Sequence, residues 1–366
     1  MHASGADQVE EAVADCVAAL GAVTDRDWRA VRAGRLEWTC RETATHIASD
    51  LIAYAGQLAG RAQNAYVPFE ITLEGSEEGL DPADNEGALH VITTTGALLA
   101  AAVRTTPRSV RAFHPYPFRH ANREGFAAMG VTEVLLHTHD IAEGLGIGYE
   151  PPADLASFVL TRLFPQVKPG PTPWRTLLWA TGRGELPGRE PVTAWRWSNN
   201  PVLRSERLTL EGVTPAAAAD LSLVGDGGFA WVGGAAADGT RKGAGNVVKQ
   251  YEEGVFHPEW GMYVLVRRED DLAVGAMGFH GVPDGDGRVE IGYDLVAGAR
   301  GQGYATEALR TLSRWALEQD GIRTVAAVVD HENVPSQNVV TRAGFTRVSE
   351  GMGQISYELL SYELRG

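Results

Sequence analysis

The spacing of apolar residues changes once along this chain, and that change limits the possible folds more than any other feature. Up to about residue 167, apolar residues recur every three to four positions, which is the period of an amphipathic helix. From about residue 203 onward, short runs alternate apolar and polar residues, as half-buried β-strands do. At 366 residues, and roughly 100–200 residues per domain, the sequence predicts two domains of different class.

The first domain, residues 1–167, is predicted to be an all-α four-helix bundle. Thr39 and Glu42 have the spacing of a capping box, which marks the start of the second helix. Gly144 and Gly146 follow the fourth apolar repeat, where C-cap glycines are expected. Four helices of this length favour a bundle. The expected helices are 7–23, 41–62, 86–104 and 125–144, with a shorter one at 153–164.

A connector at residues 168–202 separates the two domains. It holds two proline-rich breaks and four of the nine tryptophans, so we expect it to pack on a domain as a small element such as a hairpin. The second domain, residues 203–366, is predicted to be α+β with one long amphipathic helix at 303–319. Its strands are expected at 207–211, 261–267, 273–279, 288–295, 324–329 and 354–364.

Charge and composition exclude several classes of function. A net charge of −15 argues against an overall basic surface for nucleic acid or anionic lipid. No uncharged stretch reaches the ~20 apolar residues of a membrane span, and residues 1–11 lack the regions of a signal peptide. The two cysteines fit a reducing cytosol, so we expect a cytoplasmic protein. Only three of the 32 basic residues are lysines, which, with abundant alanine and glycine, indicates a high-GC genome.

The most informative stretch for function is a glycine-rich turn between a strand and the long helix. It reads Arg300-Gly-Gln-Gly-Tyr-Ala305 and follows the strand that ends near Val296. Such a turn can present free backbone N–H groups to a pyrophosphate at the positive end of a helix dipole. Gly301 and Gly303 allow close approach because they lack a Cβ. Taken alone, the turn could equally be a connection without a chemical role.

Other residues of the same domain give the turn a context. Asn333-Val-Pro-Ser336 and Arg342-Ala-Gly-Phe345 follow it, and Ser205-Glu-Arg-Leu-Thr-Leu210 opens the domain. Over about residues 203–364 the combination resembles the GNAT (Gcn5-related) N-acetyltransferase superfamily, in particular its ribosomal-protein-acetylating branch. The resemblance implies a GNAT acyltransferase fold that takes acetyl-CoA as cosubstrate. It assigns acetyl-CoA binding to Val296, Arg300, Gly301, Gln302, Gly303, Tyr304, Ala305 and Asn333.

Two residues are candidates for proton transfer in such a reaction. An amine must lose a proton before or during its attack on the thioester, so a carboxylate or an ordered water is needed nearby. Glu290, on the strand that leads into the turn, is the candidate general base, with water as the alternative. By the resemblance, Ser336 protonates the departing CoA thiolate, because residues 333–345 contain no tyrosine for that role.

A second constellation lies near the end of the fourth expected helix. Glu133 and His137 are one helical turn apart, and Asp140 extends the same face. A Glu and a His at this spacing can form half of a zinc site, although such a pair is also common as a simple polar contact. His46, on the second helix beside its apolar stripe, is the candidate third ligand.

Together with Trp38-Thr-Cys-Arg-Glu-Thr-Ala-Thr-His46, these residues resemble the DinB-like bundles of the mycothiol-dependent maleylpyruvate isomerase family, over about residues 5–165. The resemblance implies that His46, Glu133 and His137 bind a divalent metal, usually zinc, with water or a thiol such as mycothiol in the open position. It agrees with the actinobacterial character of the composition. Asp140 is then a candidate to orient a ligand histidine.

Three accounts of the function follow. In the first, an acetyl-CoA-dependent N-acetyltransferase is fused to a metal-binding bundle and acts on a small-molecule amine or natural product in preference to a protein. In the second, the bundle is only a binding or dimerisation module, which allows a homodimer. In the third, the bundle is a thiol-dependent transferase or isomerase and the GNAT domain is accessory. Neither nucleic acid nor a membrane is an expected partner.

Overall fold

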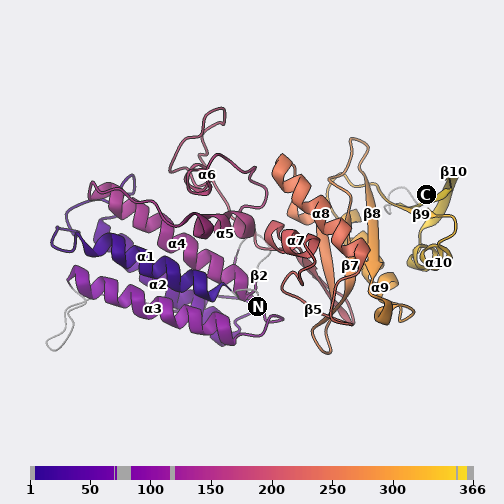
Figure 1. Cartoon of the computed structure of the whole chain (residues 1–366), viewed down its shortest axis with the longest axis horizontal. Helices are drawn as coiled ribbons and strands as arrows, with labels where there is room; N and C mark the ends of the chain where they lie inside the picture. The colour runs from indigo at the N-terminus through magenta and orange to yellow at the C-terminus, as the bar shows by residue number, and fades with distance from the viewer. Residues whose placement is uncertain (1–4, 70, 72–83, 116–119, 352, 361–366) are drawn as a thin grey trace. The chain divides into compact units, whose positions relative to one another are not determined.

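The computed structural model of the protein (Figure 1) describes residues 5–69, 71, 84–115, 120–351 and 353–360. The chain divides into two compact units. Unit 1 comprises Met1–Phe164 and Pro169–Asn199, and unit 2 comprises Pro165–Lys168 and Asn200–Gly366. Most of the connector at residues 168–202, which we expected to pack on a domain, therefore belongs to the first unit.

Unit 1 is built from helices (Figure 1). Helices α1 and α2 each pack against both α3 and α4, and α5 packs against α4 and α6. The expected capping box is present at the start of α2, where the Thr39 side chain accepts from Glu42 N–H and the Glu42 carboxylate accepts from Thr39 N–H. The elements are α1 (Ala6–Gly21), α2 (Cys40–Gly60), α3 (Asn85–Thr105), β1 (Ala112–Phe113), β2 (His120–Ala121), α4 (Arg123–Gly144), α5 (Ala153–Leu163) and α6 (Pro173–Ala180).

Helix α4 is the central element of this unit. Nearly every residue between Gly125 and Ala142 is buried, on all sides of the helix, because α1, α2, α3 and α5 contact it. Gly130 lets α3 approach closely, since a Cβ there would lie 2.5 Å from a methyl carbon of Leu99. Polar side chains on α4 therefore point into protein rather than into water, and each needs a partner.

Helix α3 is long and apolar enough to cross a membrane by length and composition alone. One face of it is fully buried, including Ile92, Leu99 and Val103, and it packs against α1 and α2, while Leu98 on another face is 48% exposed. Core helices of water-soluble domains meet the same criteria, so α3 is explained by its place in the unit.

The connector contains a short helix, α6, and no hairpin among residues 169–199, all of which the structure describes. Thr172 caps this helix by accepting from Arg175 N–H, and Pro173 occupies its first turn, where proline is favoured. The capping threonine and the proline both favour a helix, so this part of the connector is helical and not the expected hairpin. Trp174 is buried, and Trp195 lies against Phe164, so indoles of the connector pack on unit 1.

Unit 2 is an α+β domain with a mixed sheet (Figure 1). Along the sheet the strand order is β10-β11-β9-β8-β7-β6-β4-β3, and β5 pairs with β7. The elements are β3 (Val202–Arg204), β4 (Leu208–Gly212), α7 (Pro215–Ser222), β5 (Ala230–Trp231), α8 (Asp238–Glu253), a 3-10 turn (Pro258–Trp260), β6 (Met262–Arg267), β7 (Leu272–Phe279), β8 (Arg288–Leu295), a 3-10 turn (Ala297–Ala299), α9 (Tyr304–Leu317), β9 (Thr324–Asp330), α10 (Val334–Ala343), β10 (Thr346–Gly351) and β11 (Gln354–Leu360).

The expected strands are found within one or two residues, except that residues 361–364 of the last one lie outside the described residues. Strands β3, β5 and β10 were not predicted. β5 has only two residues and β10 is exposed along its whole length, so neither shows an alternating pattern. Long strands with one buried face could be predicted, and short or edge strands could not.

One feature of the sheet positions the functional site of unit 2. The parallel strands β8 and β9 pair only at Arg288–Thr324, Val289–Val325 and Glu290–Ala326. Beyond these pairs both strands continue, to Leu295 and to Asp330, without pairing with each other. The two strands therefore separate, and the sheet opens between them.

Candidate functional sites

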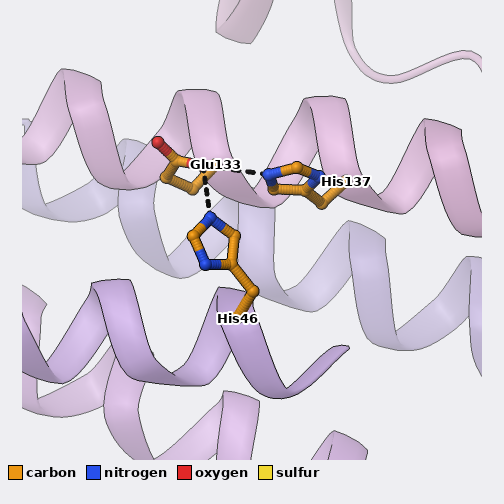
Figure 2. A group of neighbouring side chains, drawn as sticks. All are labelled: His46, Glu133 and His137. Carbon is orange, nitrogen blue, oxygen red and sulfur yellow. Dashed lines mark ion pairs between the residues drawn. The ribbon is translucent and has the colours of Figure 1, made fainter. Parts of the chain in front are cut away.

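The three predicted metal ligands of unit 1 lie together. His46 comes from α2, and Glu133 and His137 come from adjacent turns of α4 (Figure 2). Glu133 Oε2 is 3.2 Å from His137 Nε2 and 3.7 Å from His46 Nε2. One ligand atom of each residue lies within 4.8 Å of the others. Two imidazoles and a carboxylate thus face a common point between α2 and α4.

This set of donors fits a divalent ion. Zinc binds imidazole nitrogen and carboxylate oxygen at 2.0–2.2 Å, which places neighbouring donors of a tetrahedral site about 3.4 Å apart. The two measured separations bracket that value. Glu133 and His137 are buried and His46 is partly exposed beside the ring of Trp38, which is 44% exposed. The common point is therefore closed toward the core and reachable from the Trp38 side.

Asp140 holds His137 in the orientation that a metal ligand needs. Its Oδ2 lies 3.0 Å from His137 Nδ1, and the guanidinium of Arg183 donates to both carboxylate oxygens at 2.9 and 2.8 Å. Burial works against the charge of Asp140, but His137 and Arg183 outweigh it and lower the pKa of this carboxyl. The Nδ1–H of His137 is thus fixed toward Asp140, which leaves the Nε2 lone pair for an ion.

Two nearby residues were missed in the sequence. Asp50 lies one turn after His46 on α2, and its Oδ2 is 3.4 Å from His46 Nε2. Burial, and then the charge of Glu133, raise the pKa of Asp50 to about 7. Tyr54 is buried nearby, and burial together with the charges of Glu133 and Asp50 raises the pKa of its hydroxyl well above the ordinary value. The i,i+4 spacing of His46 and Asp50 was visible in the sequence, whereas their proximity to Glu133 depends on the packing of α2 on α4.

We expect Asp140→Asn to weaken divalent-metal binding by about 10–100-fold, because residues that orient a ligand histidine contribute on that scale. Titration of the metal-free protein with zinc against a chromophoric chelator measures this. Glu143→Gln is the matched control, since it removes one negative charge from an exposed side chain of the same helix. Equal affinities of the two variants would contradict the role of Asp140.

The glycine-rich turn of unit 2 has the geometry that an anion requires. Gly301 and Gly303 adopt φ values of +76° and +83°, which favour glycine, and Gly303 directly precedes α9. Within the described residues, the backbone N–H groups of Gly301, Gln302 and Gly303 donate no hydrogen bond. The first N–H groups of α9, including that of Ala305, have no partner inside the helix. Several donors are therefore left for a ligand at the positive end of α9.

The opening motif of the domain holds this turn in place. Arg207 donates to the carbonyl of Gln302 at 3.0 Å, and its guanidinium lies 4.7 Å from the centre of the Tyr304 ring. Glu307 accepts from the Ser205 hydroxyl and from the backbone and side chain of Arg207, each at 2.7 Å. The Ser205–Leu210 segment is thus the support of the turn.

Two predicted cofactor residues have different roles within the turn. The side chain of Val296 is buried, its N–H donates to Val274 and its carbonyl accepts from Ala299 N–H. Val296 therefore anchors the turn and has no free N–H for a ligand. Arg300 donates to the Leu295 carbonyl at 3.1 Å and lies 3.5 Å from Asp294, so its side chain is held against the end of β8.

A cavity of about 820 Å³ occupies the opening between β8 and β9. It is lined by β7, by Ile291–Asp294 of β8, by Ala327–Asp330 of β9, and by one side of α8. Asn333 and Ser336, at the start of α10, complete the wall. Asn333 Oδ1 accepts from Ser336 N–H at 3.2 Å, so Asn333 caps α10 and keeps its amide nitrogen for a ligand.

Residues 207–346 match the family described as acetyltransferase (GNAT) domain. The carboxy-terminal part of this chain is a GNAT acetyltransferase domain. YjdG, an uncharacterized N-acetyltransferase of Bacillus subtilis (strain 168), is 34% identical over 83 residues, which are 23% of this chain and 49% of YjdG. The chain spans about half the length of the curated relatives it matches.

Solved structures of acetyltransferases are also similar to part of the chain. A GNAT-family acetyltransferase from Bacillus anthracis is 16% identical and an acetyltransferase from Agrobacterium tumefaciens str. C58 is 24% identical. They cover 44% and 47% of this chain and 98% and 99% of their own chains, each with a TM-score of 0.32.

The GNAT domain also places the two predicted proton-transfer residues. Glu290 is not among the residues that line the cavity; its carboxylate lies 2.9 Å from Nδ1 of His280, which does line it. Ser336 lines the cavity, and the Tyr293 hydroxyl donates to its carbonyl at 3.2 Å. His280 and Tyr293 were missed because strand pairing and packing, rather than sequence spacing, bring them to Glu290 and Ser336.

Proposed function

We propose that the GNAT domain transfers an acetyl group from acetyl-CoA to the amine of a small molecule. The observations that support this most directly are the free N–H groups of the turn at Gly301–Gly303 and the cavity between β8 and β9 in the same domain. The turn provides charge-assisted hydrogen bonds for a pyrophosphate. The cavity provides a channel of the size that small ligands occupy.

The cavity residues have distinct tasks in this reaction. The amine nitrogen attacks the acetyl carbonyl carbon, the carbon–sulfur bond breaks, and an amide and a CoA thiolate form. The proton that the amine loses goes to His280, whose other ring nitrogen is held by Glu290, or to water. Ser336 protonates the thiolate, and Asn333 contacts the pantetheine arm. Glu290 thus acts by positioning His280 rather than by direct contact.

The proposal is tested by following CoA thiol release from acetyl-CoA with a panel of primary amines and with peptides that carry a free N-terminus. Amine-dependent release with at least one small amine is the expected result. Release only with peptides would indicate that the acceptor is the N-terminus of a protein and not a small molecule. No release with any acceptor, from a folded protein, would contradict acetyl transfer.

We expect Ser336→Ala to reduce the turnover of the best acceptor by about 100-fold, since a positioned acid contributes on that scale. The apparent KM for acetyl-CoA should change little, because the backbone that holds Ser336 stays in place. Ser349→Ala, an exposed serine of β10, serves as the control. Unchanged turnover in Ser336→Ala would show that another group protonates the thiolate.

For unit 1 we propose a divalent metal centre held by His46, Glu133 and His137, with zinc as the ion. The support is the set of three donors together with the Asp140–Arg183 pair that orients His137. When bound, such an ion lowers the pKa of a coordinated water or thiol. A low-molecular-weight thiol such as mycothiol is the substrate class that this chemistry suits. Loss of metal without loss of acetyl transfer would favour two independent sites.

A further inference from the structure

A fourth oxygen donor stands at the edge of the group formed by His46, Glu133 and His137. Asp50 Oδ2 lies 3.4 Å from His46 Nε2, the same nitrogen that faces Glu133. Neighbouring donors around a tetrahedral ion are about 3.4 Å apart. Asp50 therefore approaches the metal-facing side of the His46 ring, whereas a residue that only oriented this ring would contact Nδ1.

The environment of Asp50 links it to Glu133. His46 is the shared neighbour of the two carboxylates, since its Nε2 lies 3.4 Å from Asp50 Oδ2 and 3.7 Å from Glu133 Oε2. Because Asp50 and Glu133 are both largely buried and share this neighbour, their negative charges repel each other. The side chains beside them are imidazoles, which must be neutral to bind an ion. The two negative charges equal the charge of one divalent ion. The site is thus electrically balanced when Asp50 and Glu133 both face a dication.

Asp50 stands outside the group formed by His46, Glu133 and His137, but its side chain can reach the point that these three residues face. The side chain is 25% exposed, compared with 12% for Glu133, so it keeps freedom to rotate. It lies on α2, one turn from His46, and both residues rest on the same rigid helix. Rotation of the carboxylate moves its oxygen without any change in the backbone.

We propose that Asp50 is a fourth protein ligand of the divalent ion, which gives a centre of two histidines and two carboxylates. This inference rests on the metal centre proposed above. Four protein donors fill a tetrahedral site, so an incoming thiol or water must displace Asp50 or raise the coordination number. Asp50 then occupies, in the resting protein, the position that a substrate takes.

Metal titrations of the full-length protein test this. Metal-free wild type, Asp50→Asn, Asp50→Ala and the control Asp25→Asn, which alters an exposed carboxylate before α2, are titrated with Co²⁺ and with Zn²⁺ against a competing chelator. The visible d–d absorption of Co²⁺ reports the coordination geometry. We expect both Asp50 variants to bind at least about tenfold more weakly and to show altered Co²⁺ bands at saturation, and Asp25→Asn to match wild type.

The outcomes separate this inference from the metal centre itself. If wild type binds no ion, both fail. If wild type binds one ion and the Asp50 variants bind it equally well, only the role of Asp50 is overturned. Weaker binding with unchanged Co²⁺ bands at saturation would also overturn it, because Asp50 would then act from outside the coordination sphere. Asp50→Asn keeps the volume of the side chain, and circular dichroism of each variant verifies folding before titration.

Discussion

A His137→Ala variant is expected to lose stoichiometric zinc, with an affinity more than about 100-fold below that of wild type. The imidazole supplies one donor directly, and its loss also leaves Asp140 and Arg183 without the group they orient. Metal content after incubation with zinc and gel filtration, measured by mass spectrometry, gives the result. Chelation should lower the melting temperature of wild type and leave that of the variant unchanged.

His139→Ala is the matched control for this experiment. His139 lies on the same helix two residues further on, and its ring packs against Trp174 instead of the metal group. The His139→Ala substitution removes an imidazole from the same helix, one that is less buried than His137, without touching a proposed ligand. If His137→Ala retains one zinc per chain, or if wild type holds none, the assignment of the ligands is wrong.

The second large effect is expected in the GNAT domain, from Gly301→Ala. A Cβ at this position meets no atom of the protein within 4 Å, so it projects into open space beside the free N–H groups. The φ of +76° adds strain of about 1–2 kcal/mol for any residue with a side chain. We expect the kcat/KM for acetyl-CoA to fall at least about tenfold, mainly through KM, since a misplaced N–H donor weakens a charge-assisted hydrogen bond.

Gly321→Ala separates strain from ligand contact. Gly321 has a φ of +79°, and a Cβ there also meets no atom within 4 Å, but it lies in the loop between α9 and β9, away from the turn. Both substitutions should lower the free energy of unfolding by a similar amount, measured with denaturant. Only Gly301→Ala should affect acetyl-CoA. An equal loss of kcat/KM in both would show that strain, and not the turn, determines the effect.

Features that depend on short stretches of sequence could be predicted. The capping box at Thr39 fixes the start of α2 and so the direction of His46, and the i,i+4 spacing aligns Glu133 with His137. The turn at Gly301 and Gly303 has the backbone that its glycines favour. In each case the residues involved lie within one turn of helix or one tight turn of chain.

Features that depend on contacts between distant segments could not be predicted. Arg183 is 43 residues from Asp140, and Tyr293 is 43 residues from Ser336. His280 meets Glu290 because β7 and β8 are adjacent and antiparallel, which fixes a register that no local pattern contains. Such contacts follow from sheet order and helix packing, so the sequence pattern could name candidates for a site but could not name their partners.

The position of Arg183 has a consequence for how the polypeptide can be divided. Arg183 follows α6 in the connector, yet its guanidinium donates two hydrogen bonds to Asp140, the carboxylate behind His137. A protein shortened after residue 167 would keep all three ligands and lose the cation that neutralises Asp140. The smallest fragment expected to keep the proposed zinc site intact therefore extends to about Asn199, and an evolutionary exchange of the other domain would leave this tail with the helices.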